Sequence, residues 1–161
     1  MKNVIFLIVL LLTFSCKKEE EKKDIVNQKD IINQKDGDWV ILNDKNKIPE
    51  QIKDFFLASE KDELKIANPD EEFNITDVVL KPNLPFRQLR LLEKKNQTWR
   101  MVYIQGGIGK SYQFYEFKIQ GDTISEIKKA YSFENIETND SLEYYIKKEK
   151  VKFEKIKIKY E

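Results

Sequence analysis

The pattern of apolar and polar residues divides the chain into two parts. Near the N-terminus, a short positively charged start precedes an unbroken apolar run, Val4–Leu12, and a dense run of lysine and glutamate follows. From residue 38 onward, apolar residues recur at the intervals of helices and strands, between short polar turns. The pattern therefore predicts a targeting segment, a polar linker and a single globular domain over residues 38–161.

Period-two alternation, which is typical of strands, dominates this domain. We expect strands near residues 74–80, 86–94, 98–105, 112–120, 123–133 and 151–160. Short polar or glycine-rich turns separate the middle strands and indicate hairpins. Hairpins place consecutive strands side by side in opposite directions, so the sheet should be a mainly antiparallel meander.

The predicted strand 112–120 carries large apolar residues on both of its faces. Tyr112 and Phe114 share one face, while Tyr115 and Phe117 share the opposite one. Such a pattern indicates either a β-bulge or a strand that is covered on both sides.

Two segments show helical spacing instead. One is residues 48–59, in which Pro49 suits the first turn, and the other is residues 140–148, with Asn139 or Asp140 as its N-cap. We therefore expect an α+β domain, with a curved, mainly antiparallel sheet meander and one or two packed helices. Closure of the sheet into a barrel is the main alternative.

The composition removes most catalytic machinery from consideration. The 161 residues include no histidine and one cysteine, which excludes Ser–His and Cys–His nucleophiles, an intramolecular disulfide and a thiolate zinc cluster. Lysine and arginine number 29 against 28 acidic residues, which argues against nucleic acid as a partner. We therefore predict no catalytic residue set, no metal and no cofactor.

Two short motifs suggest ligand sites, but each has a simpler interpretation. The stretch "GGIGKS", Gly106–Ser111, has the glycines and lysine of a phosphate-binding loop, yet Ile104 stands where that pattern requires glycine. We interpret it as a hairpin turn. The acidic run Asp70–Glu72 could bind calcium through carboxylate oxygens, although a solvated turn is the more frequent use of such a run.

Four aromatic residues are candidates for a ligand surface. Trp39, Trp99, Tyr112 and Tyr115 could together form a platform for a glycan. Aromatic residues in β-rich domains more often belong to the core, so a core position is the alternative for each of them.

The stretch "LLTFSC", which ends at Cys16, resembles the lipobox of bacterial lipoproteins. In that family the signal peptide is removed before the cysteine, which is lipidated and becomes the first residue of the mature protein. The resemblance implies a signal peptide over residues 1–15, a lipid anchor on Cys16 and a tether over residues 16–37. An ordinary secretory signal with a chance cysteine is the alternative.

The charged residues behind this cysteine carry a second resemblance. In "CKKEEE", Lys18, Glu19 and Glu20 are similar to the surface-export signal of Bacteroidota lipoproteins, a lysine followed by two acidic residues at that offset. The resemblance implies a protein anchored in the outer membrane and exposed on the cell surface. A polar tether on a periplasm-facing lipoprotein is the alternative.

Together these observations predict a membrane-anchored lipoprotein of the cell envelope. Its domain should be a non-catalytic binding domain for an unknown protein or glycan, in an immunity or accessory role. The alternative is a carboxylate-dependent hydrolase of the cell envelope. A deep pocket with two acidic side chains of raised pKa would favour the hydrolase, and a shallow surface would favour the binding domain.

Overall fold

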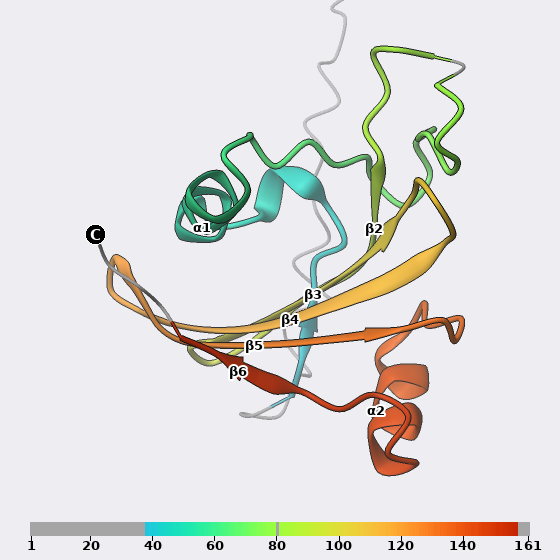
Figure 1. Ribbon diagram of the computed structural model, residues 1–161. Helices are drawn as coiled ribbons and strands as arrows, with labels where there is room; N and C mark the ends of the chain where they lie inside the picture. The colour runs from blue at the N-terminus through green and yellow to red at the C-terminus, as the bar shows by residue number, and fades with distance from the viewer. Residues whose placement is uncertain (1–37, 80, 158–161) are drawn as a thin grey trace, which may run out of the picture. The chain divides into compact units, whose positions relative to one another are not determined.

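The computed structural model describes residues 38–79 and 81–157, which form an open six-stranded sheet with two helices (Figure 1). The strands are β1 (Val40–Ile41), β2 (Arg87–Lys95), β3 (Thr98–Gln105), β4 (Ser111–Gln120), β5 (Thr123–Ser132) and β6 (Glu154–Ile156). The helices are α1 (Glu50–Glu60) and α2 (Asn139–Lys147), and a 3-10 turn, η1 (Lys45–Lys47), precedes α1. The strands lie in chain order, and every neighbouring pair is antiparallel. This confirms the predicted α+β class and meander, and the open sheet replaces the barrel-like alternative.

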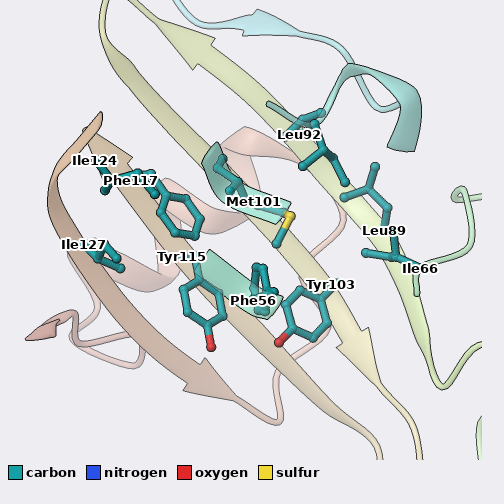
Figure 2. Packing of buried hydrophobic residues seen from close by; sticks show 12 residues of the cluster. Phe56, Ile66, Leu89, Leu92, Met101, Tyr103, Tyr115, Phe117, Ile124 and Ile127 are labelled. Atoms are coloured by element: carbon teal, nitrogen blue, oxygen red, sulfur yellow. The ribbon is translucent and has the colours of Figure 1, made fainter. Parts of the chain in front are cut away.

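The sheet is covered on both faces, with α1 on one and α2 on the other (Figure 1). We name the buried residues on these faces the α1-face cluster and the α2-face cluster. The α1-face cluster consists of Ile48, Ile52, Phe56, Ile66, Leu89, Leu92, Met101, Tyr103, Tyr115, Phe117, Ile124 and Ile127 (Figure 2). The α2-face cluster consists of Leu91, Val102, Ile104, Tyr112, Phe114, Ala130, Ile136, Leu142 and Val151.

Strand β4 is covered on both of its faces, and it also contains an irregularity in its pairing with β5. Tyr112 and Phe114 belong to the α2-face cluster, while Tyr115 and Phe117 belong to the α1-face cluster. The pairing with β5 is regular through these positions and shifts only after Lys118. The strand is therefore covered on both sides, and an irregularity lies beyond the covered part.

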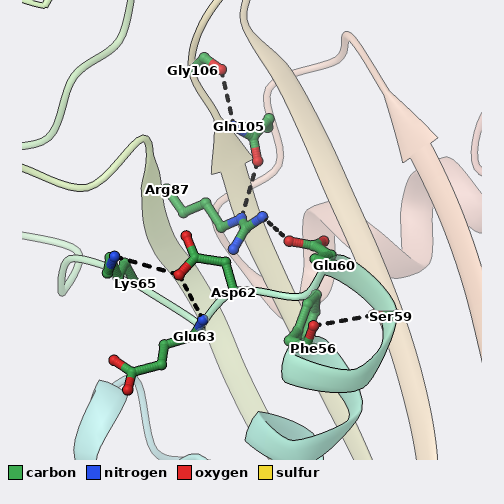
Figure 3. Close-up of polar contacts among 9 residues, drawn as sticks. All are labelled: Phe56, Ser59, Glu60, Asp62, Glu63, Lys65, Arg87, Gln105 and Gly106. Carbon is green, nitrogen blue, oxygen red and sulfur yellow. Dashed lines mark hydrogen bonds and ion pairs between the residues drawn. The ribbon is translucent and has the colours of Figure 1, made fainter.

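Helix α1 is held to the sheet by its aromatic side chains and by its last turn. Phe56 is fully buried and packs edge-to-face against Tyr115, with ring centroids 5.2 Å apart. At the C-terminal end of the helix, Glu60 accepts a hydrogen bond from Arg87 (Figure 3). The Arg87 guanidinium also lies 5.7 Å from the Tyr103 ring centroid. Burial of one such aromatic ring contributes about 2–3 kcal/mol, so ring packing outweighs the ion pair.

Helix α2 lies where it was predicted, but its N-cap differs from the two predicted residues. Thr138 caps the helix, because its backbone is extended while Asn139 is already helical. The Thr138 hydroxyl accepts from the Ser141 amide at 3.2 Å, and the Ser141 hydroxyl accepts from the Thr138 amide at 3.2 Å. This reciprocal pair is a capping box, in which serine replaces the more frequent glutamate.

The prediction of a strand over residues 74–80 is wrong, because the described part of this range forms a loop. The Asn74 side-chain amide donates to the carbonyl oxygens of Lys81 (3.0 Å) and Leu84 (2.9 Å), which closes the chain into a turn. An isolated bridge between Thr76 and Gly107 joins this loop to the end of the β3–β4 hairpin. Residue 80 lies outside the described residues.

The last strand is shorter than predicted. β6 begins at Glu154, whereas Val151, the first residue of the predicted strand, is buried in the α2-face cluster before the strand starts. Its Ile156 packs against the α1-face cluster, and the predicted continuation over residues 158–160 lies outside the described residues.

The predicted signal peptide and tether, residues 1–37 with Cys16, Lys18, Glu19 and Glu20, also lie outside the described residues. Residues Lys35–Glu161 form one compact unit. Within the described ranges, neither helix has the length and apolar character needed to cross a bilayer.

Gly106, directly after β3, allows the loop to approach the sheet closely. Its amide donates to the Phe86 carbonyl oxygen at 2.7 Å, and the Gly107 amide donates to the Ile75 carbonyl oxygen at 3.2 Å. A Cβ atom on Gly106 would lie 2.1 Å from the Asn74 carbonyl oxygen, a distance that no side chain can adopt. The contact between loop and sheet therefore requires glycine here.

We predict that Gly106→Ala detaches the loop from β3 and lowers the free energy of unfolding by about 2 kcal/mol, because backbone must move to make room. Urea unfolding measures the stability, and hydrogen exchange of the Gly107 amide measures the detachment. Gly109→Ala is the control: its Cβ meets no atom within 4 Å, although its φ of +90° strains any side chain. Loss of Gly107 protection in the control, or its retention in Gly106→Ala, would contradict the prediction.

Candidate functional site

Four exposed aliphatic side chains belong to two loops near the end of the sheet where β3 meets β4. We call Ile75, Val78, Val79 and Ile108 the apolar tip. Ile108, in the β3–β4 turn, is 97% exposed and Val78 is 62% exposed. The Thr76–Gly107 bridge holds the two contributing loops together. The turn between β3 and β4 is the hairpin turn predicted at "GGIGKS", and it contributes Ile108 to the apolar tip.

The base of the apolar tip is fastened to the core by a chain of polar contacts (Figure 3). Arg87, which binds Glu60 of α1, also donates from Nε to the Gln105 side-chain oxygen at 3.1 Å. The Gln105 side-chain amide then donates to the Gly106 carbonyl oxygen at 3.0 Å. Helix α1, β2 and the β3–β4 turn are thus connected, so the tip projects from a fixed base.

Beside the tip lies a hollow of about 410 Å³. Its apolar lining comes from Phe73, Ile75, Val78 and Leu84. Its rim is acidic, with three consecutive carboxylates, Asp70, Glu71 and Glu72, against the single ammonium of Lys81. We call it the acidic hollow. An apolar floor with a charged rim is the arrangement of a protein-binding surface.

The carboxylates of the rim differ in their partners. Glu71 accepts hydrogen bonds from Lys45 Nζ (2.6 Å) and the Asn68 amide (2.9 Å), and these contacts hold its pKa below the usual range. Glu72 pairs with Lys81. Across the part of the chain that the structure describes, Asp70 and Asp77 have no ion-pair partner. No group of side chains in those same ranges could hold a metal ion. Two of the three rim carboxylates are therefore compensated by lysine, and Asp70 is the rim carboxylate without such a partner among the described residues.

At the opposite end of the sheet, a row of charged residues of alternating sign crosses four strands on the α2 face. The strand register aligns Glu93, Arg100, Glu116 and Lys128. Arg100 Nε donates to Glu116 at 3.1 Å, and Lys128 Nζ donates to Glu116 at 2.7 Å. Arg100 also binds Glu143 of α2, so the row connects this helix to the sheet.

Glu93 is the unusual member of this row. Its side chain is fully buried, and within the described chain neither carboxylate oxygen accepts a hydrogen bond. Its closest charged contact is Arg100 Nη1, at 3.5 Å from Oε1. Burial, only partly offset by this guanidinium, raises the pKa of the Glu93 carboxyl to about 7.

Glu116, two strands away, behaves in the opposite way. Burial alone would raise its pKa, but hydrogen bonds from Lys128 and Arg100 outweigh burial and hold the pKa below the usual range. Within the described residues, Glu93 is the only carboxyl in this row whose pKa is raised, and it lines no hollow. The row therefore lacks the pair of accessible acids that a carboxylate-dependent hydrolase would need.

The four candidate aromatic residues do not form a common surface. Tyr112 and Tyr115 are buried on opposite faces of the sheet, because β4 is covered on both sides. Trp99 packs against the α1-face cluster. Trp39 instead lies over Arg100, with the guanidinium carbon 4.1 Å from the ring centroid. Both tyrosines are therefore core residues, which was the alternative interpretation. The two tryptophans lie on different faces of the sheet.

Two further hollows are lined by charged residues. One, of about 710 Å³, lies by Trp39, Lys95, Arg100 and Glu116 at the β2–β3 turn. The other, of about 690 Å³, contains Lys45, Lys53 and Lys65. These three lysines pair with Glu71, Glu50 and Asp62, respectively. Their charge is locally balanced, so this hollow offers no net attraction to an anion.

Sequence reasoning missed both the apolar tip and the charge row, although signals for each were present. A two-residue turn at Asn96–Gln97 places Glu93 opposite Arg100, so hairpin register alone pairs them. For the tip, Ile108 between glycines is an aliphatic residue at a turn, where polar residues are usual. The contact of that turn with the loop after Asn74 had no local signal.

We predict that Glu93→Gln makes the protein less sensitive to pH between pH 5 and pH 8. The pKa of Glu93 is about 7 in the folded chain against an ordinary value of 4.5, so folding binds a proton. The stabilisation by this proton is fully present below about pH 4.5 and is lost as the pH rises past 7. The wild-type protein should therefore lose about 2 kcal/mol relative to Glu93→Gln between pH 5 and pH 8.

Urea unfolding at both pH values measures this difference, and comparing two pH values cancels any change in packing. Glu126→Gln is the control, because hydrogen bonding to Lys155 holds the pKa of Glu126 below its usual range and outside this window. Parallel pH profiles for the wild-type protein and Glu93→Gln would contradict the assignment of the buried proton to Glu93.

Comparison with known proteins assigns no family to this chain. No family model, no curated protein and no solved structure matches it. The resemblance of the N-terminal residues to a lipoprotein signal and the geometry of the domain are therefore the basis for a functional assignment.

Proposed function

We propose that the protein is a lipoprotein anchored through Cys16 in the outer membrane and exposed on the cell surface, and that its domain binds a partner protein without catalysing a reaction. The apolar tip carries this proposal. Its four aliphatic side chains are exposed on two loops that are fastened to each other and to the core. Exposed aliphatic side chains that one partner could cover together are a feature of interaction sites.

The chemistry of the tip favours a protein over a glycan. Aliphatic side chains offer no hydrogen-bond partner for sugar hydroxyls, and burying those hydroxyls unpaired would be unfavourable. Trp39, a half-buried aromatic residue that lines one of the hollows, already has the Arg100 guanidinium against its ring. Full burial of an aliphatic side chain the size of Ile108 in a partner contributes about 2 kcal/mol, and several together give useful affinity.

The position of the tip suits presentation away from the membrane. The described chain starts at Asp38, and β1 pairs with Glu93 and Lys94 beside the β2–β3 turn. The apolar tip lies at the other end of β3, which spans eight residues, or about 25 Å. A tether that ends before Asp38 would therefore join the domain near the β2–β3 end, at the opposite end of β3 from the tip.

The carboxylate-dependent hydrolase is less well supported. The hollows named above are open, and none of them is lined by a carboxyl whose pKa is raised. The carboxyl with a raised pKa near neutrality, Glu93, is fully buried and therefore cannot reach a substrate without a rearrangement.

We predict that Cys16→Ala prevents acylation and releases the protein from the membrane fraction, whereas replacing Lys18, Glu19 and Glu20 by alanine preserves membrane attachment and abolishes surface exposure. Metabolic labelling with an alkyne fatty acid, membrane fractionation and digestion of intact cells by added protease measure these outcomes. A labelled, membrane-bound Cys16→Ala protein would contradict the anchor, and unchanged protease sensitivity of the triple variant would contradict the export signal.

We predict that the tip contacts a specific protein on intact cells. A photoreactive phenylalanine analogue in place of Ile108 should give one discrete adduct, and adding Val78→Asp should lower its yield about tenfold, because a buried carboxylate disrupts the interface. The same analogue in place of Leu57, an exposed aliphatic residue of α1, is the control and should give no such adduct. Equal adducts from both positions, or adducts with lipid only, would contradict a protein-binding tip.

A further inference from the structure

The residues around the apolar tip indicate which kind of partner it would bind. The tip and the acidic hollow share Ile75 and Val78, so a partner that covers one also meets the other. Asp70 forms part of the rim of the hollow, and Asp77 lies between the tip residues Ile75 and Val78 in the chain. The surface around Ile75 and Val78 thus combines apolar side chains with the carboxylates of Asp70 and Asp77, while Lys110 follows Ile108 in the β3–β4 turn.

The negative charge near the tip is not neutralised within the domain. Glu71 and Glu72 are engaged by Lys45 and Lys81, whereas Asp70 and Asp77 pair with no cation among the described residues. A neutral or acidic partner would leave or worsen this imbalance, because like charges brought together at an interface repel each other. A partner with lysine or arginine at matching positions would relieve it.

Resting on the proposed role of the tip in protein binding, we propose that the tip and the acidic hollow bind a basic segment of the partner. This segment inserts an aliphatic side chain against Phe73, Ile75, Val78 and Leu84. Its lysine or arginine side chains lie near Asp70, at the hollow, and near Asp77, which adjoins the lining residues Thr76 and Val78 in the chain. The apolar contacts supply most of the affinity. The charges supply selectivity and a faster association that salt weakens.

The hollow and the tip suit an extended segment of this kind. The hollow, at about 410 Å³, has room for one or two aliphatic side chains, and it is open to solvent along its rim. The loop that forms it is closed by Asn74 and fastened through Gly106, so binding does not have to order it first. An alternating segment would place its apolar residues on the hollow and its basic residues at the rim.

Two synthetic peptides test this proposal with the chain Lys35–Glu161, which forms one compact unit and contains every residue of both buried clusters. In one peptide leucine alternates with lysine, and in the other leucine alternates with glutamate. The leucine–lysine peptide should bind about tenfold more tightly at low salt, and this preference should shrink at about 1 M salt. Amide resonances of residues 75–78 and 107–109 should shift on binding.

Variants separate the apolar and the charged parts of the site. Val78→Asp should weaken binding of the leucine–lysine peptide about tenfold through loss of the apolar contact. Asp70→Asn combined with Asp77→Asn should remove most of the preference, because it weakens binding of the leucine–lysine peptide and relieves the repulsion of the leucine–glutamate peptide. Leu57→Asp is the control for a general change in surface polarity and should alter neither affinity.

Several results would overturn the proposal. These are equal affinity for both peptides, a preference for the leucine–glutamate peptide, shifts confined to another surface, or absence of binding by either peptide. Self-association of the chain that Val78→Asp abolishes, or binding to neutral phospholipid vesicles through the tip, would assign the surface to a second copy or to a bilayer. A discrete Ile108 adduct on cells, together with no charge preference here, would retain the protein-binding function and reject only the basic partner.

Discussion

Strands β3 and β4 are apolar on both faces, and this constraint determines the arrangement of the rest of the domain. Met101 and Tyr115 face α1, whereas Val102 and Phe114 face α2. An antiparallel sheet with one solvated face needs a single cover, but these strands need two. The β1–β2 connection contributes α1, which covers one face, and the β5–β6 connection contributes α2, which covers the other. Neither helix, at 11 and 9 residues, would be stable alone, so sheet and helices depend on each other.

The cover on the α2 face is incomplete, and the charge row occupies the part that remains. Leu142 of α2 joins the apolar cluster, while the neighbouring Glu143 reaches Arg100. Arg100 is thereby shared among three carboxylates, and Glu93 receives the weakest of these contacts. A buried ion pair contributes little net stability, because desolvation offsets attraction. This is why the pKa of Glu93 is raised: the protonated carboxyl avoids the free-energy cost of a buried negative charge.

Much of the fold could be predicted because it depends on local pattern. The strand predicted at 98–105 has the observed bounds, since alternation and the flanking turns are both encoded within it. The N-cap of α2 was displaced by one or two residues, because Thr138, Asn139 and Asp140 can all cap a helix and only backbone geometry selects among them. The error at 74–80 has another origin. Alternation is present there, but non-local hydrogen bonds from Asn74 close the segment into a loop.

The candidate site was harder to predict because its parts come from distant segments. Nothing near Ile75 in the sequence indicates that Ile108 lies beside it, and their proximity depends on the space that Gly106 leaves for the Asn74 carbonyl. The prediction that four aromatic residues form a ligand surface was wrong for a different reason. Both faces of the sheet are covered, so side chains are buried that would be exposed on a sheet with one solvated face. Residue type alone could not distinguish these two cases.

The two ends of the sheet differ in a way that bears on binding. The end at Trp39 is polar and joined to α2 through the charge row, whereas the end at Ile108 is aliphatic and joined to α1 through Arg87 and Gln105. Contacts that hold the tip in place are made during folding, so a partner does not lose free energy in ordering it. The free energy of burying the aliphatic side chains is then available for affinity. Because the unpaired rim charges act over longer range than these contacts, they would influence which partners approach before the apolar surfaces meet.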